Sequence, residues 1–249
     1  MQNHALASGT PPAAFLSSDA LHTPPSLKLH HQHPWYLTPS TARQLQDDLS
    51  GYVRIEPLPL KGIQYVAGVD ASFREEKVCA AVAVYQFSDL ELITETTAQV
   101  PISFPYIPGL LSFCEAPGIL AALEQLAGLP DVLIVDGHGL AHPRRFGLAC
   151  HLGVLLDIPT IGCAKSILVG EARDLGKEVG STAELISDEE MLGVALRTRR
   201  EVKPVYVSIG HRVDIDSAVQ IVLSCGKGYR LPEPIRRAHS LAKQTCLAQ

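Results

Sequence analysis

Residues 131–139 have the sequence DVLIVDGHG, and this stretch decides how the rest of the chain is interpreted. Its apolar run, 132–135, is typical of a buried strand in a parallel sheet. Asp136 follows directly, and two glycines flank the next histidine, so that the backbone can approach a ligand closely. A tight turn capped by Asp136 is the alternative interpretation. Because sites gather at the carboxyl ends of parallel strands, we expect the site at Asp136 and in the loop 137–147.

The segments on either side of this stretch predict the fold class. Three β-like runs precede it: 65–73, 78–87 and 92–100. The other expected elements are a helix over 112–126 interrupted at Pro117, a helix over 146–156, strands over 160–164 and 204–209, a helix over 217–224 and a last helix from Pro234. Short polar links between the first three runs indicate an antiparallel meander. The sequence therefore predicts an α/β fold with a mixed central sheet, in which an antiparallel meander is followed by parallel strands, flanked by helices.

The N-terminal part differs from the rest in composition. Residues 1–37 are rich in Pro, His, Ser and Ala and lack sustained apolar periodicity, which predicts a flexible arm. Its His30, His31 and His33 could bind a metal, but incidental histidines in a flexible tail are the favoured interpretation. A helix start is expected near Thr38, so residues 38–249 are predicted to form a single domain.

Composition and charge limit the classes of protein. The chain has 249 residues, 46% of them hydrophobic, which excludes a wholly disordered protein. Its formal net charge of −5 alone argues against a nucleic-acid partner. The charge is uneven, however, because residues 197–249 carry ten Lys and Arg against four acids, a net of +6. We therefore expect contacts to a nucleic-acid backbone in this basic stretch.

The cysteines and the absence of sorting signals indicate the compartment. Six cysteines are spread over positions 79, 114, 150, 163, 225 and 246 without a CxxC pair, which predicts free thiols in a reducing environment. The sequence shows neither a secretory signal nor an uncharged apolar run of ~18 residues. We expect a cytoplasmic, monomeric protein with no membrane partner.

Two further carboxylates become candidates once the strands are placed. Asp70 lies inside an apolar strand, where a charge is costly unless it is paired or metal-bound; a turn cap is the alternative. Glu115 lies at a helix start, where it often only complements the helix dipole. If the first and fourth strands are neighbours, Asp70 and Asp136 meet at the sheet centre, and the helix after the third strand can deliver Glu115. Three such carboxylates need a counter-charge, and oxygen ligands select Mg²⁺ or Mn²⁺, a site that suits phosphoryl chemistry.

Three histidines have alternative interpretations. His239 lies in the expected last helix, where it could complete the ligand set or act on the leaving group or water; a surface histidine is the alternative. His138 and His142 have the spacing of a zinc pair. That spacing requires helical geometry, for which the intervening Gly-Leu-Ala is poor, so zinc is disfavoured.

Six runs, in this order, carry a resemblance to a known family: GVDASF, PYIPGLLSFCEAP, VDGHGLAHPRRFGLACHLG, TIGCAKS, GHRVDIDSA and GYRLPEPIRRAH. Over roughly residues 40–245 the chain resembles the endonuclease V family, the deoxyinosine 3′-endonucleases. The resemblance implies a ribonuclease H-like fold and Mg²⁺-dependent cleavage, with Mn²⁺ as a substitute, of DNA containing inosine, the product of adenine deamination. The cut is expected at the second phosphodiester bond 3′ of inosine, leaving a 3′-hydroxyl and a 5′-phosphate, as a step in DNA repair. Inosine-containing RNA stays open as a second substrate.

The resemblance also implies roles for individual residues. The metal-site positions of the family match Asp70, Glu115, Asp136 and His239, the last being Asp or His in different members. The family's active-site lysine matches Lys165, whose charge would contact the scissile phosphate or water; a solvated strand-end lysine is the alternative. Cys114 stands where arginine is frequent in the family, which predicts a weaker local contact to phosphate or carboxylate.

Recognition of the base is implied by two further matches. The strand-separating wedge of the family matches Pro105, Tyr106, Ile107 and Pro108. Such a stiff aromatic element can push between bases, although a structural loop is the alternative. The base pocket of the family matches Gly109, Leu111, Gly137, Gly139 and His142. Backbone hydrogen bonds and a close-fitting shape hold a flipped base, which would explain the glycines.

Two other classes of protein stay open at this point. A ribonuclease H-like nuclease of other specificity, such as a junction or flap enzyme, also uses clustered carboxylates but needs no base pocket. A non-catalytic nucleic-acid-binding module gains nothing from negative charge concentrated near phosphate. Cleavage of inosine-containing strands compared with branched DNA separates the first class, and metal-dependent cleavage itself separates the second.

Overall fold

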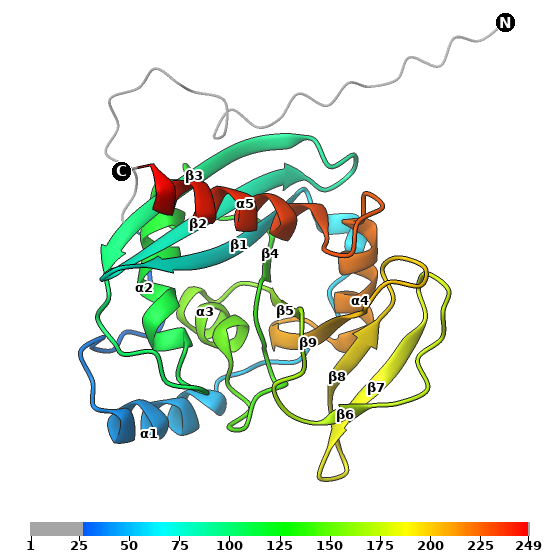
Figure 1. The fold of residues 1–249 in the computed structure, drawn as a ribbon, viewed down its shortest axis with the longest axis horizontal. Helices are drawn as coiled ribbons and strands as arrows, with labels where there is room; N and C mark the ends of the chain where they lie inside the picture. The colour runs from blue at the N-terminus through cyan, green and yellow to red at the C-terminus, as the bar shows by residue number, and fades with distance from the viewer. Residues whose placement is uncertain (1–26, 249) are drawn as a thin grey trace, which may run out of the picture.

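A computed structural model describes residues 27–248 of the chain (Figure 1). Within this range the strands form one sheet in the order β3-β2-β1-β4-β5-β9-β8-β7-β6. The strands are β1 (Tyr65–Arg74), β2 (Lys77–Gln86), β3 (Leu92–Pro101), β4 (Val132–Val135), β5 (Thr160–Ala164), β6 (Glu171–Ala172), β7 (Thr182–Ser187), β8 (Glu190–Leu196) and β9 (Val205–His211). The helices are α1 (Pro39–Ser50), the 3₁₀ turn η2 (Leu60–Gly62), α2 (Ser112–Leu123), α3 (Leu148–Leu156), α4 (Ile215–Ser224) and α5 (Glu233–Leu247). The predicted α/β class with a mixed sheet is confirmed.

The strand directions agree with the prediction in the half of the sheet that contains β1. Strands β1, β2 and β3 form an antiparallel meander, and β4 pairs in parallel with both β1 and β5. In the other half, the expected strand over 204–209 is present as β9, but its direction and the strands β6, β7 and β8 were not predicted from the sequence. There β9 runs antiparallel to β5, and β7 and β8 form a hairpin next to it.

The hairpin of β7 and β8 has an unusual turn, which explains why the sequence did not reveal it. Asp188 and Glu189 both have positive φ, 52° and 67°. A two-residue hairpin turn of this kind normally contains Asn-Gly or Asp-Gly, because glycine adopts positive φ without strain. Since the chain has two acidic residues there instead, the usual signal of a hairpin is missing.

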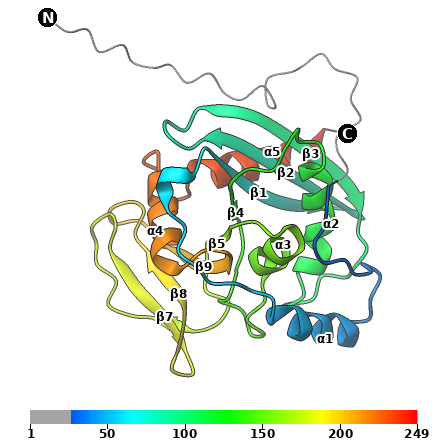
Figure 2. The same ribbon diagram turned by 180° about the vertical axis from the view of Figure 1, so that it is seen from behind.

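Helices cover both faces of the sheet (Figures 1 and 2). Val132 and Ile134 of β4 belong to an apolar cluster with residues of α4 and α5, on one face. Leu133 and Val135 belong to a second cluster with residues of α2 and α3, on the other face. This two-sided burial accounts for the continuous apolar run in β4, because a strand covered on both faces has no polar side. None of the helices in the described part of the chain is long and apolar enough to span a bilayer.

Helix α2 continues through Pro117, where the sequence predicted an interruption. Proline removes one backbone hydrogen bond from a helix interior. Packing compensates for this loss, since α2 is almost entirely buried against β2 and β3. Gly118 allows the close approach, because a Cβ there would lie 3.1 Å from the Val78 side chain. Tertiary contacts therefore override the local preference.

The N-terminal boundary is described only in part. The expected helix start is confirmed, since Thr38 caps α1 by accepting a hydrogen bond from the Thr41 amide. Of the expected arm, residues 1–26 lie outside the described residues. Residues 27–37 contact the body of the protein: Leu27, Leu29 and Trp35 pack against the cluster of α2 and α3.

The expectation that all six cysteines are free is wrong for one pair. Cys79 of β2 and Cys246 of α5 form a disulfide, with their Cα atoms 5.5 Å apart. The two residues are 167 positions apart in the sequence, so their pairing could not be deduced from spacing. The fold brings them together because α5 packs across β1 and β2 (Figure 1). The other cysteines, Cys114, Cys150, Cys163 and Cys225, are free and buried.

Candidate active site

Two carboxylates meet at the carboxyl ends of β1 and β4. In this parallel pair Val69 is in register with Val135, and the Asp136 amide donates to the Val69 carbonyl at 3.0 Å. Asp70 and Asp136 each follow this pair by one residue, so they lie side by side. The strand neighbourhood on which their expected meeting depended is therefore present.

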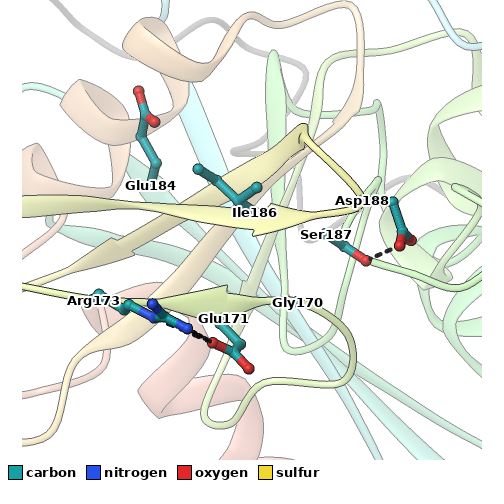
Figure 3. A pocket seen from close by; sticks show the side chains of 7 residues that line it. All are labelled: Gly170, Glu171, Arg173, Glu184, Ile186, Ser187 and Asp188. Atoms are coloured by element: carbon teal, nitrogen blue, oxygen red, sulfur yellow. Dashed lines mark hydrogen bonds and ion pairs between the residues drawn. The ribbon is translucent and has the colours of Figure 1, made fainter.

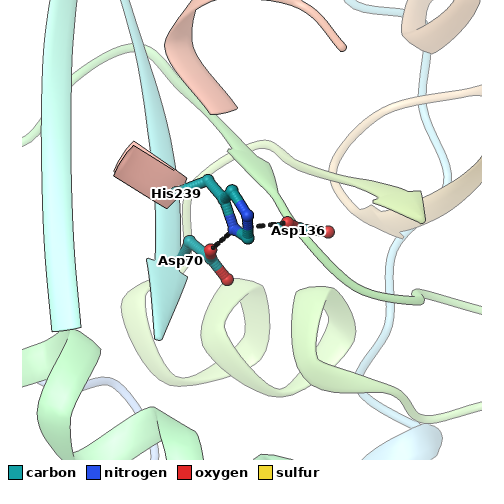
Figure 4. A group of neighbouring side chains, drawn as sticks. All are labelled: Asp70, Asp136 and His239. Atoms are coloured by element: carbon teal, nitrogen blue, oxygen red, sulfur yellow. Dashed lines mark hydrogen bonds and ion pairs between the residues drawn. The ribbon is translucent and has the colours of Figure 1, made fainter. Parts of the chain in front are cut away.

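Helix α5 adds His239 to these carboxylates (Figure 4). The Nδ1 atom of His239 lies 2.6 Å from Asp70 Oδ2 and 3.8 Å from Asp136 Oδ2. The short contact means that Nδ1–H donates to the Asp70 carboxylate, because a carboxylate can only accept. One ligand atom from each of the three residues lies within 4.8 Å of the others.

Lys165 lies at the same edge of the sheet, directly after β5. Its Nζ is 2.5 Å from Asp136 Oδ2, which places a positive charge against the carboxylate pair. Its backbone carbonyl accepts a hydrogen bond from Arg230, which fixes the end of the strand. The side chain is 36% exposed, so its ammonium group can also reach a ligand from solvent.

The crowding of carboxylates changes their protonation. Burial and the charge of Asp136 raise the pKa of Asp70 to about 6, against an opposing effect of His239 and Lys165. Glu115 is nearly inaccessible in α2, and burial followed by the charges of Asp70 and Asp136 holds its pKa well above the usual range. Glu115 does not belong to the group of three ligand residues, but the charges of Asp70 and Asp136 act on its carboxyl group. The site thus concentrates negative charge beyond what Lys165 offsets.

The donor set fits a hard divalent cation. Mg²⁺ and Mn²⁺ prefer oxygen ligands, and two of the three ligand residues here are carboxylates. Asp136 Oδ2 is fully buried and faces the Lys165 ammonium group, and since a carboxylate oxygen has two lone pairs, one is left for a cation. Among residues 27–248, Asp70, Asp136 and His239 are the one group of this kind. Neither the histidines 30, 31 and 33 nor the pair His138 and His142 forms such a group in that range.

A cavity of about 280 Å³ adjoins the carboxylates. Its lining residues are Tyr106, Pro108, Gly109, Leu111, Ser112, Glu115, Asp136, Gly137, His138, His142, Gly147, Leu148, Ser166 and Leu168. Asp136 therefore belongs both to the group of three ligand residues and to the wall of the cavity, and Glu115, on which the charge of Asp136 acts, lines the same wall. Tyr106 stands at the rim with 69% of its surface exposed, and its ring packs edge-on against Phe73.

Three of the residues expected at the wedge and pocket do not line this cavity. Pro105 is exposed, and Ile107 packs against the apolar cluster of Phe104 and Phe113. Gly139 lies behind the wall, where its amide donates to Ser208 Oγ at 2.9 Å. A Cβ on Gly139 would lie 1.9 Å from the Ile209 carbonyl oxygen, so packing against β9 alone requires glycine there.

Several lining residues were missed by sequence reasoning. Ser166 and Leu168 follow Lys165 closely, so their place was implicit in that of the lysine. His138 stands in the Gly-His-Gly stretch but was considered only as a zinc ligand. Burial lowers the pKa of His138 to about 4, and its Nδ1 is buried without a hydrogen-bond partner. Cys114 remains a neutral thiol, because burial raises its pKa to about 11.

A larger cavity of about 750 Å³ lies beside β6 and β7 (Figure 3). Its charged lining residues are Glu171, Arg173, Glu184 and Asp188. Arg173 pairs with Glu171 at 2.7 Å, and both side chains are more than 70% exposed. Solvated charges of this kind are typical of an ordinary surface, since water screens them. The carboxylate cluster and its cavity are therefore the candidate site.

Comparison with known proteins identifies relatives of this chain. The family model of Endonuclease V matches residues 47–240. The endonuclease V of Gloeobacter violaceus is 54% identical over 213 residues, which cover 84% of this chain and 86% of that protein. A crystal structure of the endonuclease V from Streptomyces avermitilis has a TM-score of 0.83 at 44% identity, over 90% of this chain and 99% of that one.

The structure of another relative contains nucleic acid. The endonuclease V of Ciona intestinalis, in complex with a 23-mer DNA containing an inosine followed by a ribo-adenosine, has a TM-score of 0.76 at 28% identity, over 85% of this chain and 99% of that one. The endonuclease V structures have a ribonuclease H-like fold, so the predicted fold is confirmed. The family model matches most of the chain, and the relatives named above match it over most of their own length. The chain therefore belongs to the endonuclease V family.

Proposed function

We propose that the protein is a metal-dependent endonuclease that recognises inosine in DNA and cleaves the second phosphodiester bond 3′ of it, leaving a 3′-hydroxyl and a 5′-phosphate. One observation carries the proposal: Asp136 belongs both to the group of metal-ligand candidates and to the wall of a cavity suited to a single base, and Glu115 lines the same wall. An enzyme that holds one base and cuts a nearby phosphate needs these two sites next to each other. The choice of substrate is supported by the Ciona intestinalis relative, an endonuclease V in complex with inosine-containing DNA.

The cation would be held by Asp70, Asp136 and His239, with Glu115 as a further carboxylate nearby. Bound there, Mg²⁺ or Mn²⁺ would supply a Lewis acid that activates water and stabilises the leaving oxygen. The chain supports this with buried carboxylates whose mutual repulsion a cation relieves. Burial first and repulsion second raise the pKa values of Asp70 and Glu115, and a bound cation would offset both effects.

Lys165 would bind the scissile phosphate. Its ammonium group lies at the edge of the cluster and is partly open to solvent, so it can donate to a phosphate oxygen while its carbonyl stays anchored by Arg230. His239 donates from Nδ1 to Asp70, which orients its ring and leaves Nε2 for a further partner.

The cavity would receive the flipped inosine base. Tyr106 at its rim is rigid between neighbouring prolines and exposed, as a wedge that replaces the base in the stack must be. His142 is buried in the wall, and burial lowers its pKa to about 4, so it presents a neutral ring. An uncharged, close-fitting wall favours a base over water or an ion. The cellular role that follows is repair of deaminated adenine in DNA, with inosine-containing RNA as a second substrate to be tested.

The test is single-turnover cleavage of matched strands with inosine or adenosine at one position, as DNA and as RNA, in Mg²⁺ and in EDTA. We expect cleavage of the inosine DNA in Mg²⁺ alone, with the cut mapped to the second bond 3′ of inosine. Equal cleavage of both strands, or stronger cleavage of a branched inosine-free duplex, would show a nuclease of other specificity. Binding without cleavage in any metal would show a binding module.

A further inference from the structure

The loop that carries the wedge residues is tied to the cavity wall through a single backbone oxygen. The Gly109 carbonyl accepts hydrogen bonds from Arg144 Nη2 at 2.6 Å and from His142 Nε2 at 3.0 Å. Gly109 has a φ of +77°, and a Cβ there would lie 3.1 Å from the Arg144 nitrogen. Gly109 directly follows the wedge, so these two bonds fix the end of the wedge against the pocket.

The tautomer of His142 follows from its contacts. The Arg144 amide donates to His142 Nδ1 at 3.2 Å, so Nδ1 is the acceptor. The ring hydrogen of the neutral histidine is therefore on Nε2, where it donates to the Gly109 carbonyl. Both groups that donate to the Gly109 carbonyl thus come from the segment 142–144. The direction of the arginine bond depends on what orients Arg144.

Gln46 of α1 orients Arg144. The Gln46 side chain is only 1% exposed, and its Oε1 accepts from Arg144 Nε at 2.7 Å. Its Nε2 donates to the Phe146 carbonyl at 3.0 Å. The amide cannot be reversed, because its nitrogen would then face the arginine and its oxygen would face the carbonyl. Gln46 therefore links the Gly109 end of the wedge loop to the start of α3 through one buried side chain.

We propose that Gln46 is a positioning residue for the wedge, acting through Arg144 on the Gly109 carbonyl. Without the Gln46 acceptor the Arg144 guanidinium has no buried partner for Nε, and it turns toward solvent, leaving Gly109 with one donor. The Gly109 end of the wedge is then held less firmly, although Ile107 stays packed at the other side, and the carboxylate cluster is unchanged. The wedge matters most when a base must be extruded from a duplex, so the defect is specific to duplex substrates. This inference rests on the proposed function.

The experiment compares single-turnover cleavage of inosine in duplex DNA and in the same single strand. Gln46→Leu is expected to lower the ratio of duplex to single-strand rate about tenfold, the effect of losing one hydrogen bond to a charged group. Because both rates scale with the concentration of folded enzyme, partial unfolding does not alter the ratio. Gln46→Glu loses the donor to the Phe146 carbonyl but keeps a charged acceptor for Arg144, so it should restore the ratio to within about threefold of wild type. Arg144→Met should reproduce the leucine variant, since it removes the same donor to Gly109 and leaves Gln46 in place.

The matched control is Gln44→Leu. Gln44 lies on the same helix, but it is exposed and binds only Asp48, at 2.9 Å, so its replacement should leave the ratio unchanged. An unchanged ratio in Gln46→Leu or in Arg144→Met would overturn the positioning role and indicate a merely structural residue. Wild-type protein that leaves inosine DNA uncut would instead refute the proposed function.

Discussion

Asp70 and Asp136 are brought together by strand register. Val69 of β1 and Val135 of β4 are the last pair of these parallel strands, and each aspartate directly follows one of them. The folded protein therefore holds two carboxylates, with Glu115 nearby, where the unfolded chain would keep them apart. This arrangement weakens the metal-free fold. It is consistent with a site selected for binding a cation and not for stability.

A substitution at Asp70 tests whether its ionised carboxylate destabilises the metal-free fold. Its folded pKa, about 6, lies above the usual 3.8, so ionisation of Asp70 destabilises the fold as pH rises from about 4 through 6. Asp70→Asn should raise the free energy of unfolding in EDTA by about 1–2 kcal/mol at pH 8 and by much less at pH 4. Urea melts at the two pH values measure this. A variant less stable than wild type at pH 8 would contradict the assignment of repulsion.

Individual site residues could be predicted from the sequence where they directly follow a strand. They could not be predicted where their role depends on packing against residues remote in the sequence. Asp136 could be selected because it ends an apolar run. The role of Gln46 could not be predicted: its spacing from Ala42 and Leu49 places it on the buried face of α1, but its partner Arg144 is remote in the sequence. Gly139 was selected for a base contact, whereas the structure shows a packing requirement that the sequence cannot separate from one.

At the scale of elements, the position of α5 decides the geometry of His239. The helix begins against β1 at Gly68, where a Cβ would lie 2.1 Å from the Pro234 carbonyl carbon and 2.4 Å from the Ile235 nitrogen. These are backbone atoms, so they cannot move aside without moving the helix. Gly68 is thus the point at which the distance between α5 and the carboxylates is set.

Gly68→Ala is therefore expected to shift α5 and to separate His239 from Asp70. Overpacking of this kind costs about 1–3 kcal/mol in the free energy of unfolding, and we expect cleavage of inosine DNA to fall at least about tenfold. Thermal melts and single-turnover rates measure the two effects. Gly128→Ala is the control, because a Cβ there meets nothing within 4 Å. Equal activities of the two variants would show that α5 tolerates displacement.

Element prediction succeeded for the meander and β4 because short links and a two-sided apolar run leave few alternatives. It failed for β7 and β8, where the turn at Asp188 and Glu189 lacks glycine. It also failed for the disulfide between Cys79 and Cys246, which depends on how α5 crosses the sheet. Long-range packing decides these features, and local sequence patterns carry no information about such packing.

For the whole molecule, the charge distribution governs binding to nucleic acid. The net charge is −5, although residues 197–249 carry +6. Several of their cations are already paired within the protein: Arg212 with Glu56, Arg236 with Glu233 and Arg237 with Glu95. These pairs lower the number of cations available for phosphates, and the protein as a whole is acidic, so recognition should depend on the cavity and wedge more than on backbone charge.

A salt titration tests this inference. Binding of inosine-free duplex should be weak, with a slope of log K against log salt shallower than about −4, the value for roughly four phosphate contacts. Inosine-containing DNA should bind more tightly with a similar slope, because the added contacts are uncharged. Tight, steeply salt-dependent binding that ignores inosine would contradict the account.

The most direct test of the central claim compares wild type with Asp136→Asn on one inosine-containing strand. Asparagine keeps the size of the side chain but removes the charge at the junction of cluster and cavity. We predict a single-turnover rate in Mg²⁺ lower by about 10²–10³-fold or more, with the affinity for the inosine strand kept within about fivefold. Cleavage by the variant at a rate close to that of wild type would contradict the placement of the active site at these carboxylates.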